Sequence, residues 1–300
     1  MDYVRKFDPQ AVADRSTAPG GVPYEYNDDL ILAVNVALAA GRPLLLRGDP
    51  GCGKTTLAAD VAWRMRWRYE PVAITSRTSA ESLKWRSDPV RRLADATDQR
   101  SAGEARDPGR YIDPGILWRA FHPDLAREYR ASIKQEAPRN AVILMDEIDK
   151  ADPDVPNDLL MVLDQGWFEV PELNNLLVAR QDEVETLIVI TTNGERDLAP
   201  AFVRRCIAYD MPKMTETQLR LIAGAHFPDF DPKLLDTVLK LLADLATRAT
   251  MERVRAPSAA EMIDALRACR ELKIVKPDST DLDKVGRAAM WKHRPADPGR

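Results

Sequence analysis

The stretch Gly48-Asp49-Pro50-Gly51-Cys52-Gly53-Lys54-Thr55-Thr56 decides the fold. It follows an apolar run at residues 43–46 and leads into an amphipathic run at 57–62, and this is the strand, loop and helix order in which a G-x-x-x-x-G-K-[ST] pattern binds phosphate. The glycines let successive backbone N–H groups turn inward, and the following helix adds its positive end. A chance glycine-rich turn would not account for this order. We therefore expect all nine residues to bind a nucleotide.

Two side chains of this stretch have defined chemical roles. The ammonium group of Lys54 would neutralise the oxygens of the β- and γ-phosphates. The hydroxyl group of Thr55 would coordinate a Mg²⁺ that bridges the same phosphates, and Thr56 continues into the helix. Residues 149–152 superficially resemble a guanine-reading tetrad but lack its asparagine, so we expect ATP and Mg²⁺ as cofactors.

A second landmark is the apolar run at residues 141–145, which ends in Asp146 and Glu147. Such a run is typical of a buried parallel strand. We expect Asp146 to hold the Mg²⁺ shell through water. Glu147 would point to the opposite side of the pleat, where it could orient and deprotonate the attacking water. A strand that simply ends in solvated acids is the alternative.

Two further polar positions follow buried strands later in the chain. The apolar run 186–192 ends in Asn193, whose amide can both donate and accept hydrogen bonds. The adjacent pair Arg204 and Arg205 precedes a short strand at 207–209. We treat Glu147, Asn193, Arg205 and Arg204 as catalytic candidates, although a solvated helix end would also explain the arginine pair.

The order of elements predicts an α/β fold, with a parallel phosphate-loop sheet followed by a small all-α lid. We divide the chain into an irregular arm at 1–27, a nucleotide-binding core at 28–212 and a helical domain at 213–300. The core contains a polar insertion at 76–139 and a hairpin at 167–180. Within the insertion, the aromatic stretch 111–121 is either a helix packed on the core or a loop that touches a neighbour or the substrate.

The charge, the cysteines and the apolar stretches of the sequence limit the kinds of partner and the cell compartment that we expect. A formal net charge of −4 gives no overall basic surface, so we do not expect nucleic acid as a partner. Three widely spaced cysteines match neither a disulfide framework nor a metal site, which indicates a reducing cytosol. No apolar stretch is long enough to span a bilayer, so we expect a cytoplasmic protein that does not contact a membrane.

Together these motifs resemble those of the AAA+ ATPases, and the hairpin, the insertion and residues 201–206 are most similar to the MoxR-type branch. The resemblance implies hexameric homo-oligomeric rings with ATP between subunits. It also implies chaperone-like remodelling of a partner protein, such as one with a von Willebrand factor A domain. In these terms Asn193 is sensor 1 and Arg205 is the arginine finger, while Arg204 assists or pairs within its own subunit. The sensor 2 arginine is absent from its usual helix, and Arg255 is the substitute we assign.

Three functions remain open at this level. The first is an ATP-hydrolysing ring that remodels a partner protein. The second is an ATP-dependent assembly switch that controls a separate effector and turns over slowly. The third is a motor subunit of a DNA-processing system, which the acidic balance disfavours.

Overall fold

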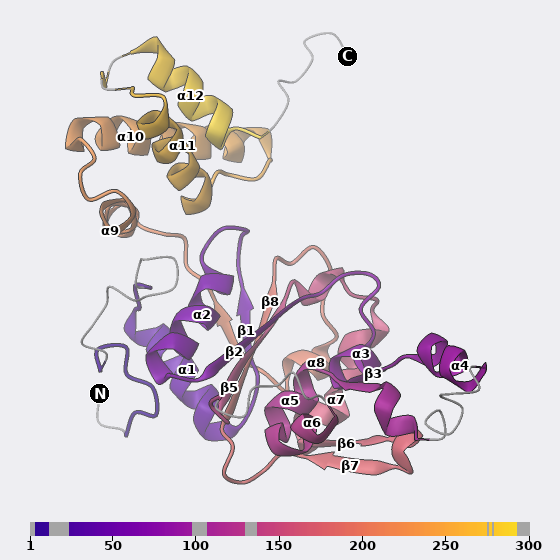
Figure 1. The fold of residues 1–300 in the computed structure, drawn as a ribbon. Helices are drawn as coiled ribbons and strands as arrows, with labels where there is room; N and C mark the ends of the chain where they lie inside the picture. The colour runs from indigo at the N-terminus through magenta and orange to yellow at the C-terminus, as the bar shows by residue number, and fades with distance from the viewer. Residues whose placement is uncertain are drawn as a thin grey trace. The chain divides into compact units, whose positions relative to one another are not determined.

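The computed structural model describes residues 4–11, 24–97, 107–129, 137–274, 276–277 and 279–292. These described residues fall into two compact units, whose elements Figure 1 labels. The first unit takes the described residues of 1–14, 26–47 and 54–210, and the second takes those of 15–25, 48–53 and 211–300. Parts of the expected arm (1–3, 12–23), of the insertion (98–106, 130–136) and of the helical domain (275, 278, 293–300) lie outside the described residues.

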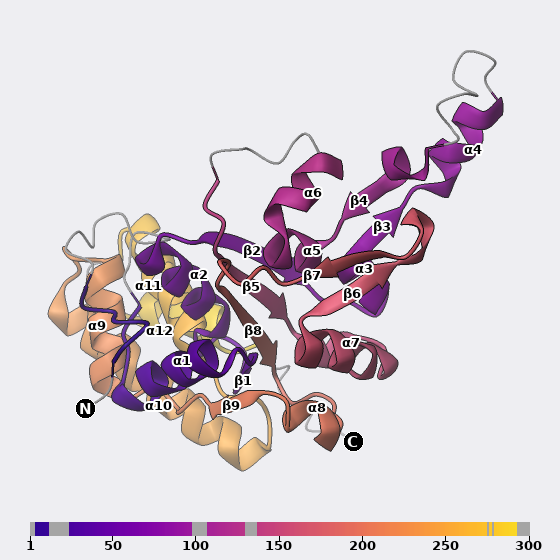
Figure 2. The same ribbon diagram turned by 90° about the horizontal axis from the view of Figure 1, so that it is seen from below.

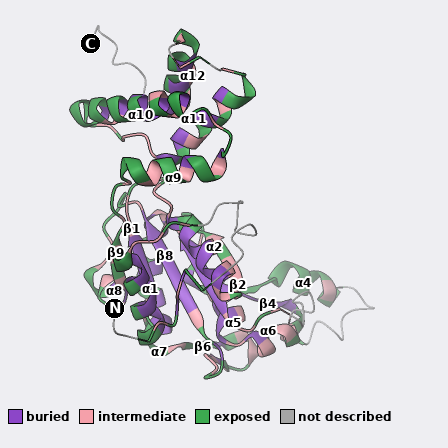
Figure 3. Ribbon diagram, turned by 90° about the vertical axis from the view of Figure 1, so that its left-hand side faces the viewer, coloured by how far each residue is buried: buried purple, intermediate pink, exposed green. Residues whose placement is uncertain are grey.

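The first unit is built on a parallel sheet that, in the part of the chain described, has five strands in the order β2-β5-β8-β1-β9. Its strands are β1 Leu44–Arg47, β2 Arg68–Ala73, β5 Ala141–Asp146, β8 Thr186–Thr192 and β9 Ile207–Asp210. The three central strands are buried almost throughout (Figure 3), as strands covered on both faces must be. The predicted α/β class with a parallel phosphate-loop sheet is confirmed.

Helices cover both faces of this sheet (Figure 2). Helices α1 (Asp28–Ala40) and α2 (Lys54–Met65) lie on one face. Helix α1 begins where the Asn27 side chain accepts a hydrogen bond from the Leu30 amide, and it ends at Gly41 in the left-handed conformation. Helix α2 follows the glycine-rich loop directly, so its first turn carries Lys54 and Thr55.

The described start of the arm is anchored on α1. Phe7 is buried, and the Asn35 amide bonds to it in both directions. Asn35 Oδ1 accepts from the Lys6 and Phe7 amides at 2.7 and 2.9 Å, and Nδ2 donates to the Phe7 carbonyl at 2.8 Å. These bonds satisfy a polar side chain that is only 5% exposed.

The insertion between β2 and β5 contains more β-structure than the sequence indicated. Strands β3 (Trp85–Ser87) and β4 (Ile112–Pro114) pair antiparallel. The other elements are α3 Ala80–Lys84, α4 Pro89–Thr97, η3 Pro108–Tyr111, α5 Ile116–Phe121 and α6 Pro123–Tyr129. Of the two alternatives for residues 111–121, the structure shows a helix packed on the core, because Trp118 and Phe121 of α5 are fully buried there.

A helix and a hairpin connect β5 to β8. A short turn, η4 (Ile148–Lys150), leads to α7 (Asp154–Gln165). Strands β6 (Trp167–Val170) and β7 (Leu176–Ala179) then pair antiparallel across η5 (Pro171–Leu173), and α8 (Pro200–Val203) follows β8. The hairpin buries Phe168, Val170 and Val178 against the core while Trp167 and Leu177 stay exposed.

The second unit is helical in its described C-terminal part. It contains α9 (Glu216–His226), α10 (Pro232–Glu252), α11 (Ala259–Glu271) and α12 (Thr280–Met290). Their apolar faces form a separate core that includes Val238, Leu245, Met262 and Cys269. No helix among the described residues is long and apolar enough to cross a membrane.

Candidate nucleotide-binding site

Asp146 is the last residue of β5, and Glu147 lies just beyond the strand. The strand ends at Asp146, and Glu147 adopts the left-handed conformation (φ 60°, ψ 54°) before η4 begins. This conformation is uncommon for a residue with a Cβ and costs on the order of 1–2 kcal/mol. The strand alternation on which the expected direction of Glu147 was based therefore ends at Asp146, because the backbone turns before the alternation continues. Such local strain is a frequent feature of functional sites.

Asp146 is bound to two threonine hydroxyls. Thr55 Oγ1 lies 2.9 Å from Asp146 Oδ2 and 3.2 Å from Oδ1, and Thr191 Oγ1 donates to Oδ1 at 2.6 Å. The same Thr191 oxygen accepts a hydrogen bond of 2.8 Å from the Glu147 amide. Thr191 was missed by the sequence analysis, and it links both acids to β8.

Lys54, Asn193 and Glu147 form a continuous chain of hydrogen bonds. Lys54 is 6% exposed, and its Nζ donates to Asn193 Oδ1 at 2.8 Å. Asn193 Nδ2 donates to Glu147 Oε1 at 3.0 Å. The orientation of the amide follows from chemistry, since an ammonium group only donates and an ionised carboxylate only accepts. We call these residues the carboxyl-edge cluster: Lys54, Thr55, Asp146, Glu147, Thr191 and Asn193.

An acidic residue, Asp149, and a basic residue, Lys150, lie next to the cluster and were not assigned a role from the sequence. Asp149 is 3% exposed, and its Oδ2 accepts from the Asn193 and Glu195 amides at 3.1 and 3.0 Å. Lys150 Nζ donates to Glu147 Oε2 at 2.5 Å, and this hydrogen bond raises the pKa of Lys150. The spacing of three residues between Glu147 and Lys150 was the available signal, because residues i and i+3 of a helical turn are neighbours.

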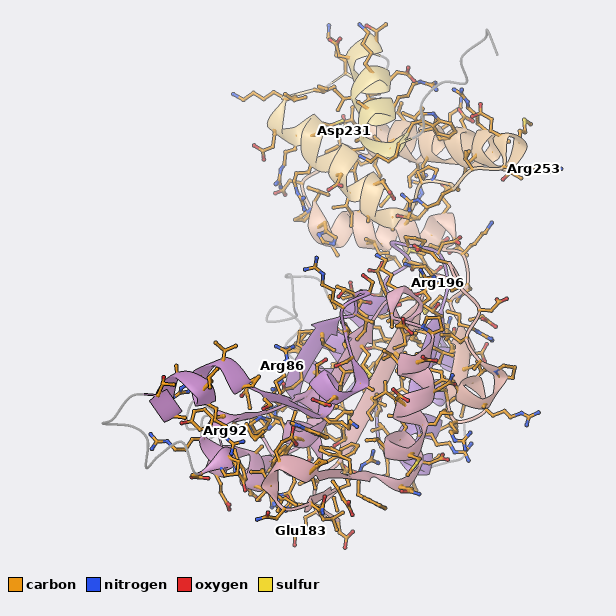
Figure 4. All side chains as sticks on the ribbon, turned by 90° about the vertical axis from the view of Figure 1, so that its right-hand side faces the viewer. Arg86, Arg92, Glu183, Arg196, Asp231 and Arg253 are labelled. Atoms are coloured by element: carbon orange, nitrogen blue, oxygen red, sulfur yellow. The ribbon has the colours of Figure 1, made fainter. Side chains whose placement is uncertain are left out.

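The loop after β8 is also tied to the turn after η4. Arg196, labelled in Figure 4, donates from Nη1 to the Ala151 carbonyl at 3.2 Å. Together with the Asp149 contacts, this bond joins the segments after β5 and β8. The backbone that positions Asn193 is therefore held at several points.

The glycine-rich loop at 48–53 is grouped with the helical unit. Gly51 and Gly53 have φ of 79° and 95°, which favour glycine, and a Cβ on Gly51 would come within 2.2 Å of Ser258 Oγ. Within the loop the Cys52 amide donates to the Asp49 carbonyl at 3.3 Å. The backbone fits a loop that turns its N–H groups towards an anion.

Arg255 contacts this loop. Its Nη1 donates to the Pro50 carbonyl at 3.4 Å, and Nη2 is paired with Glu261. Burial alone would raise the pKa of Glu261, but hydrogen bonds from Ser258 and Arg255 hold it below its ordinary value. Glu261 is thus an anionic anchor at the start of α11 that fixes Arg255 beside the loop.

The donor set fits ATP and Mg²⁺. Thr55 and Asp146 offer hard oxygen atoms, which Mg²⁺ prefers together with phosphate oxygens and water. No group of three or more His, Cys, Asp or Glu residues that could hold a metal occurs among the described residues. Mg²⁺ bound beside phosphates has one or two carboxylate ligands and takes the others from phosphate and water. Thr56 is exposed on α2 and takes part in none of these bonds.

The arginine pair after α8, Arg204 and Arg205, is not brought to the cluster. Arg205 Nε pairs with Asp164 Oδ2 of α7 at 2.5 Å, and its Nη1 donates to the Ala201 carbonyl at 3.0 Å. Arg204 is exposed, and its carbonyl accepts from Arg42. Pairing within the subunit was considered for Arg204, but in the structure it is Arg205 that pairs. In the described part of the chain, neither guanidinium group hydrogen bonds to the carboxyl-edge cluster.

Known proteins resemble this chain in sequence and in fold. The chain is 25% identical over 268 residues to "Lon protease homolog 2, peroxisomal" of Zea mays, covering 78% of this chain and 26% of that protein. The Arabidopsis thaliana protein of the same name is 27% identical over 207 residues, covering 66% and 19%. The chain thus spans about a quarter or less of the length of these relatives.

The fold resembles a solved structure of a RuvB mutant from Thermotoga maritima, with 16% identity and a TM-score of 0.51. The similarity covers 88% of this chain and 70% of that one. A family model described as "AAA domain (dynein-related subfamily)" matches residues 43–206, from the strand before the glycine-rich loop to the residue after the arginine pair. Because this match covers more than half of the 300 residues, the chain belongs to the dynein-related subfamily of AAA domains.

Proposed function

We propose that the protein is a ring-forming, MoxR-like AAA+ ATPase that hydrolyses ATP to remodel or activate a partner protein. Membership of the AAA family implies ATPase activity in general. The single observation that supports catalysis at this site is the chain of hydrogen bonds from Lys54 through Asn193 to Glu147. In the proposal, this chain joins the cation that would bind phosphate, the amide that would orient the base and the carboxylate that would act as base.

Each residue has one task in this mechanism. The amides of 48–53 and the Lys54 ammonium group would bind the triphosphate, while Thr55 would coordinate Mg²⁺ and Asp146 would hold its shell through water. The bound Mg²⁺ would supply positive charge for the phosphate oxygens. Glu147, oriented by Asn193, takes a proton from the water that attacks the γ-phosphorus as the bond to the ADP oxygen breaks. Arg255 beside the loop is the group we assign to sensing the nucleotide.

The arginine finger comes from a neighbouring subunit in this proposal. Arg205 is the residue that we assign, and Arg204 is the alternative. In its own chain Arg205 is paired with Asp164, outside the carboxyl-edge cluster. A cation supplied in trans can stabilise the charge that develops on the γ-phosphate. This division of labour would make the homo-oligomeric ring, which we take as a hexamer, necessary for turnover.

The partner is proposed to be a protein. The curated relatives carry the name of a protease, so the proteins of that name act on polypeptides. A von Willebrand factor A domain protein is the partner that the MoxR-type resemblance favours. The formal charge of −4 argues against the DNA-motor alternative. The odd number and wide spacing of the cysteines favour a reducing cytosol.

A slow assembly switch remains the second candidate, and one observation favours it. Both oxygens of Glu147 already accept hydrogen bonds, from Asn193 and from Lys150. A base restrained in this way is compatible with slow turnover.

Steady-state ATP hydrolysis by the full chain, measured over a range of protein concentrations with candidate partners present and absent, tests the proposal. A remodelling ATPase should hydrolyse ATP faster when its partner is added. A slow rate that no partner changes, combined with ATP-dependent assembly, would favour the switch. No hydrolysis at any concentration would contradict the proposed activity.

A further inference from the structure

Lys150 makes the second contact to the proposed base, from outside the nucleotide motifs. Its Nζ lies 2.5 Å from Glu147 Oε2, while Asn193 Nδ2 lies 3.0 Å from Oε1. Each oxygen of the carboxylate therefore has its own donor. The left-handed backbone at Glu147 starts the turn η4, and this turn brings the side chain of Lys150 back to Glu147 three residues later.

The two contacts differ in how firmly their donors are held. Asn193 is fixed twice, because its Oδ1 accepts from Lys54 and its backbone amide donates to the buried Asp149. Lys150 has a side chain that is 41% exposed, against 35% for Glu147. The hydrogen bond to Glu147 raises the pKa of Lys150, and the charges of Glu147, Glu195 and Asp149 add to this effect. The contact from Lys150 is therefore the one that can be released without disturbing the other.

We propose that Lys150 is a latch on Glu147, a positioning residue that holds the base in a paired, non-productive arrangement and must withdraw from Oε2 before each turnover. The proposal rests on the ATPase function proposed above and adds its regulation. An ammonium group at Oε2 occupies the oxygen that Asn193 leaves open, so it competes with an attacking water for the carboxylate. An ion pair of this exposure is weak, so thermal motion can open it and a small bias can change how often it is open.

Substitution of Lys150 by Met tests the latch in the full chain. The Lys150→Met variant keeps the length of the side chain and removes its charge. We expect kcat for ATP hydrolysis to rise about two- to fivefold, the range that an exposed pair can contribute, with KM for ATP changed less than twofold. Lys150→Arg should return kcat to that of the parent, because it restores a cation at the same place. Lys150→Gln is a second neutral variant for the case in which Met impairs folding.

Lys6→Met is the matched control. Lys6 Nζ pairs with Glu185 at 2.7 Å, its side chain is 46% exposed, and Glu185 precedes β8 at the opposite edge of the sheet. This variant should behave as the parent does. A rise in kcat for Lys6→Met equal to that for Lys150→Met would overturn the latch, because the effect would then be one of general charge.

A double variant shows whether Lys150 acts through Glu147. In the Glu147→Gln background, adding Lys150→Met should leave the residual rate unchanged, since there is no base to release. An unchanged or lower kcat for Lys150→Met alone, or a rise that persists in the Glu147→Gln background, would overturn the latch while leaving the ATPase proposal intact. A parent chain without any hydrolysis would overturn both.

Discussion

Asn193 of the carboxyl-edge cluster and the pair Arg204 and Arg205 lie in the same segment between β8 and β9, yet the cluster and the arginine pair are organised in opposite ways. Every member of the cluster is hydrogen bonded to another member, across α2, β5 and β8. Arg205 instead pairs with Asp164 on the helix before the hairpin. The proposed division, in which one subunit would hold nucleotide and water while a neighbour supplies the cation for the transition state, would account for this difference.

Substitution of Glu147, the proposed base, should have the largest effect. Glu147→Gln keeps the shape and the hydrogen bond from Asn193 but cannot take a proton, so turnover should fall by roughly 10² or more while ATP still binds. Phosphate release measures turnover, and a fluorescent ATP analogue measures binding. Glu183→Gln is the control, because Glu183 is an exposed acid paired with Arg139. Turnover at the parent rate would remove Glu147 from the mechanism.

Lys54, the buried cation of the cluster, should determine the affinity for ATP. Lys54→Ala removes the side-chain charge expected to face the β- and γ-phosphates, so the Kd for ATP should rise at least tenfold, which is about 1.4 kcal/mol. Equilibrium titration with the same analogue measures this. Lys6→Ala removes an exposed lysine of the arm and should leave the Kd unchanged. An unchanged Kd for Lys54→Ala would mean that the loop does not bind the triphosphate as proposed.

Breaking the ion pair between Arg205 and Asp164 should have the smallest effect on the hydrolysis rate. Both side chains are partly exposed, at 36% and 43%, so the pair is worth roughly 0.2–1 kcal/mol. Asp164→Asn should release the finger and raise the rate per subunit by up to about fivefold at limiting protein concentration. Asp236→Asn, which weakens the exposed pair with Arg220, is the control. A lower rate for Asp164→Asn would show that Asp164 positions Arg205 for use.

The sheet could be predicted because its signals are local. Continuous apolar runs such as 141–145, each followed by a polar group or a glycine, are typical of buried parallel strands. The helices of the second unit were also visible, since Leu234, Val238, Leu241 and Leu245 recur with helical spacing. Strands β3 and β4 were missed because they have three residues each and pair across a long separation, which leaves no periodic pattern.

The carboxyl-edge cluster could be predicted only in part, because the backbone conformation at Glu147 has no signal in the sequence. Asp146, Glu147 and Asn193 follow buried strands, and parallel strands bring such positions to one edge. The left-handed turn at Glu147 could not be read from the sequence, because no glycine or asparagine marks it. The spacing of three residues between Glu147 and Lys150 was visible, but their contact depends on that turn. The partner of Arg205 depends on packing between α7 and the segment after α8.

Mixing two inactive variants tests most directly whether the site is shared between subunits. Lys54→Ala chains should bind little ATP but still offer Arg205, and Arg205→Ala chains should bind ATP but offer no finger. Neither should turn over alone, because the finger acts mainly on the transition state. Mixed in equal amounts, they should recover at least about a tenth of the parent rate, as fingers supplied in trans contribute large factors. A mixture that co-assembles by light scattering yet stays as inactive as its parts, with Arg204→Ala in place of Arg205→Ala giving the same result, would contradict the shared site.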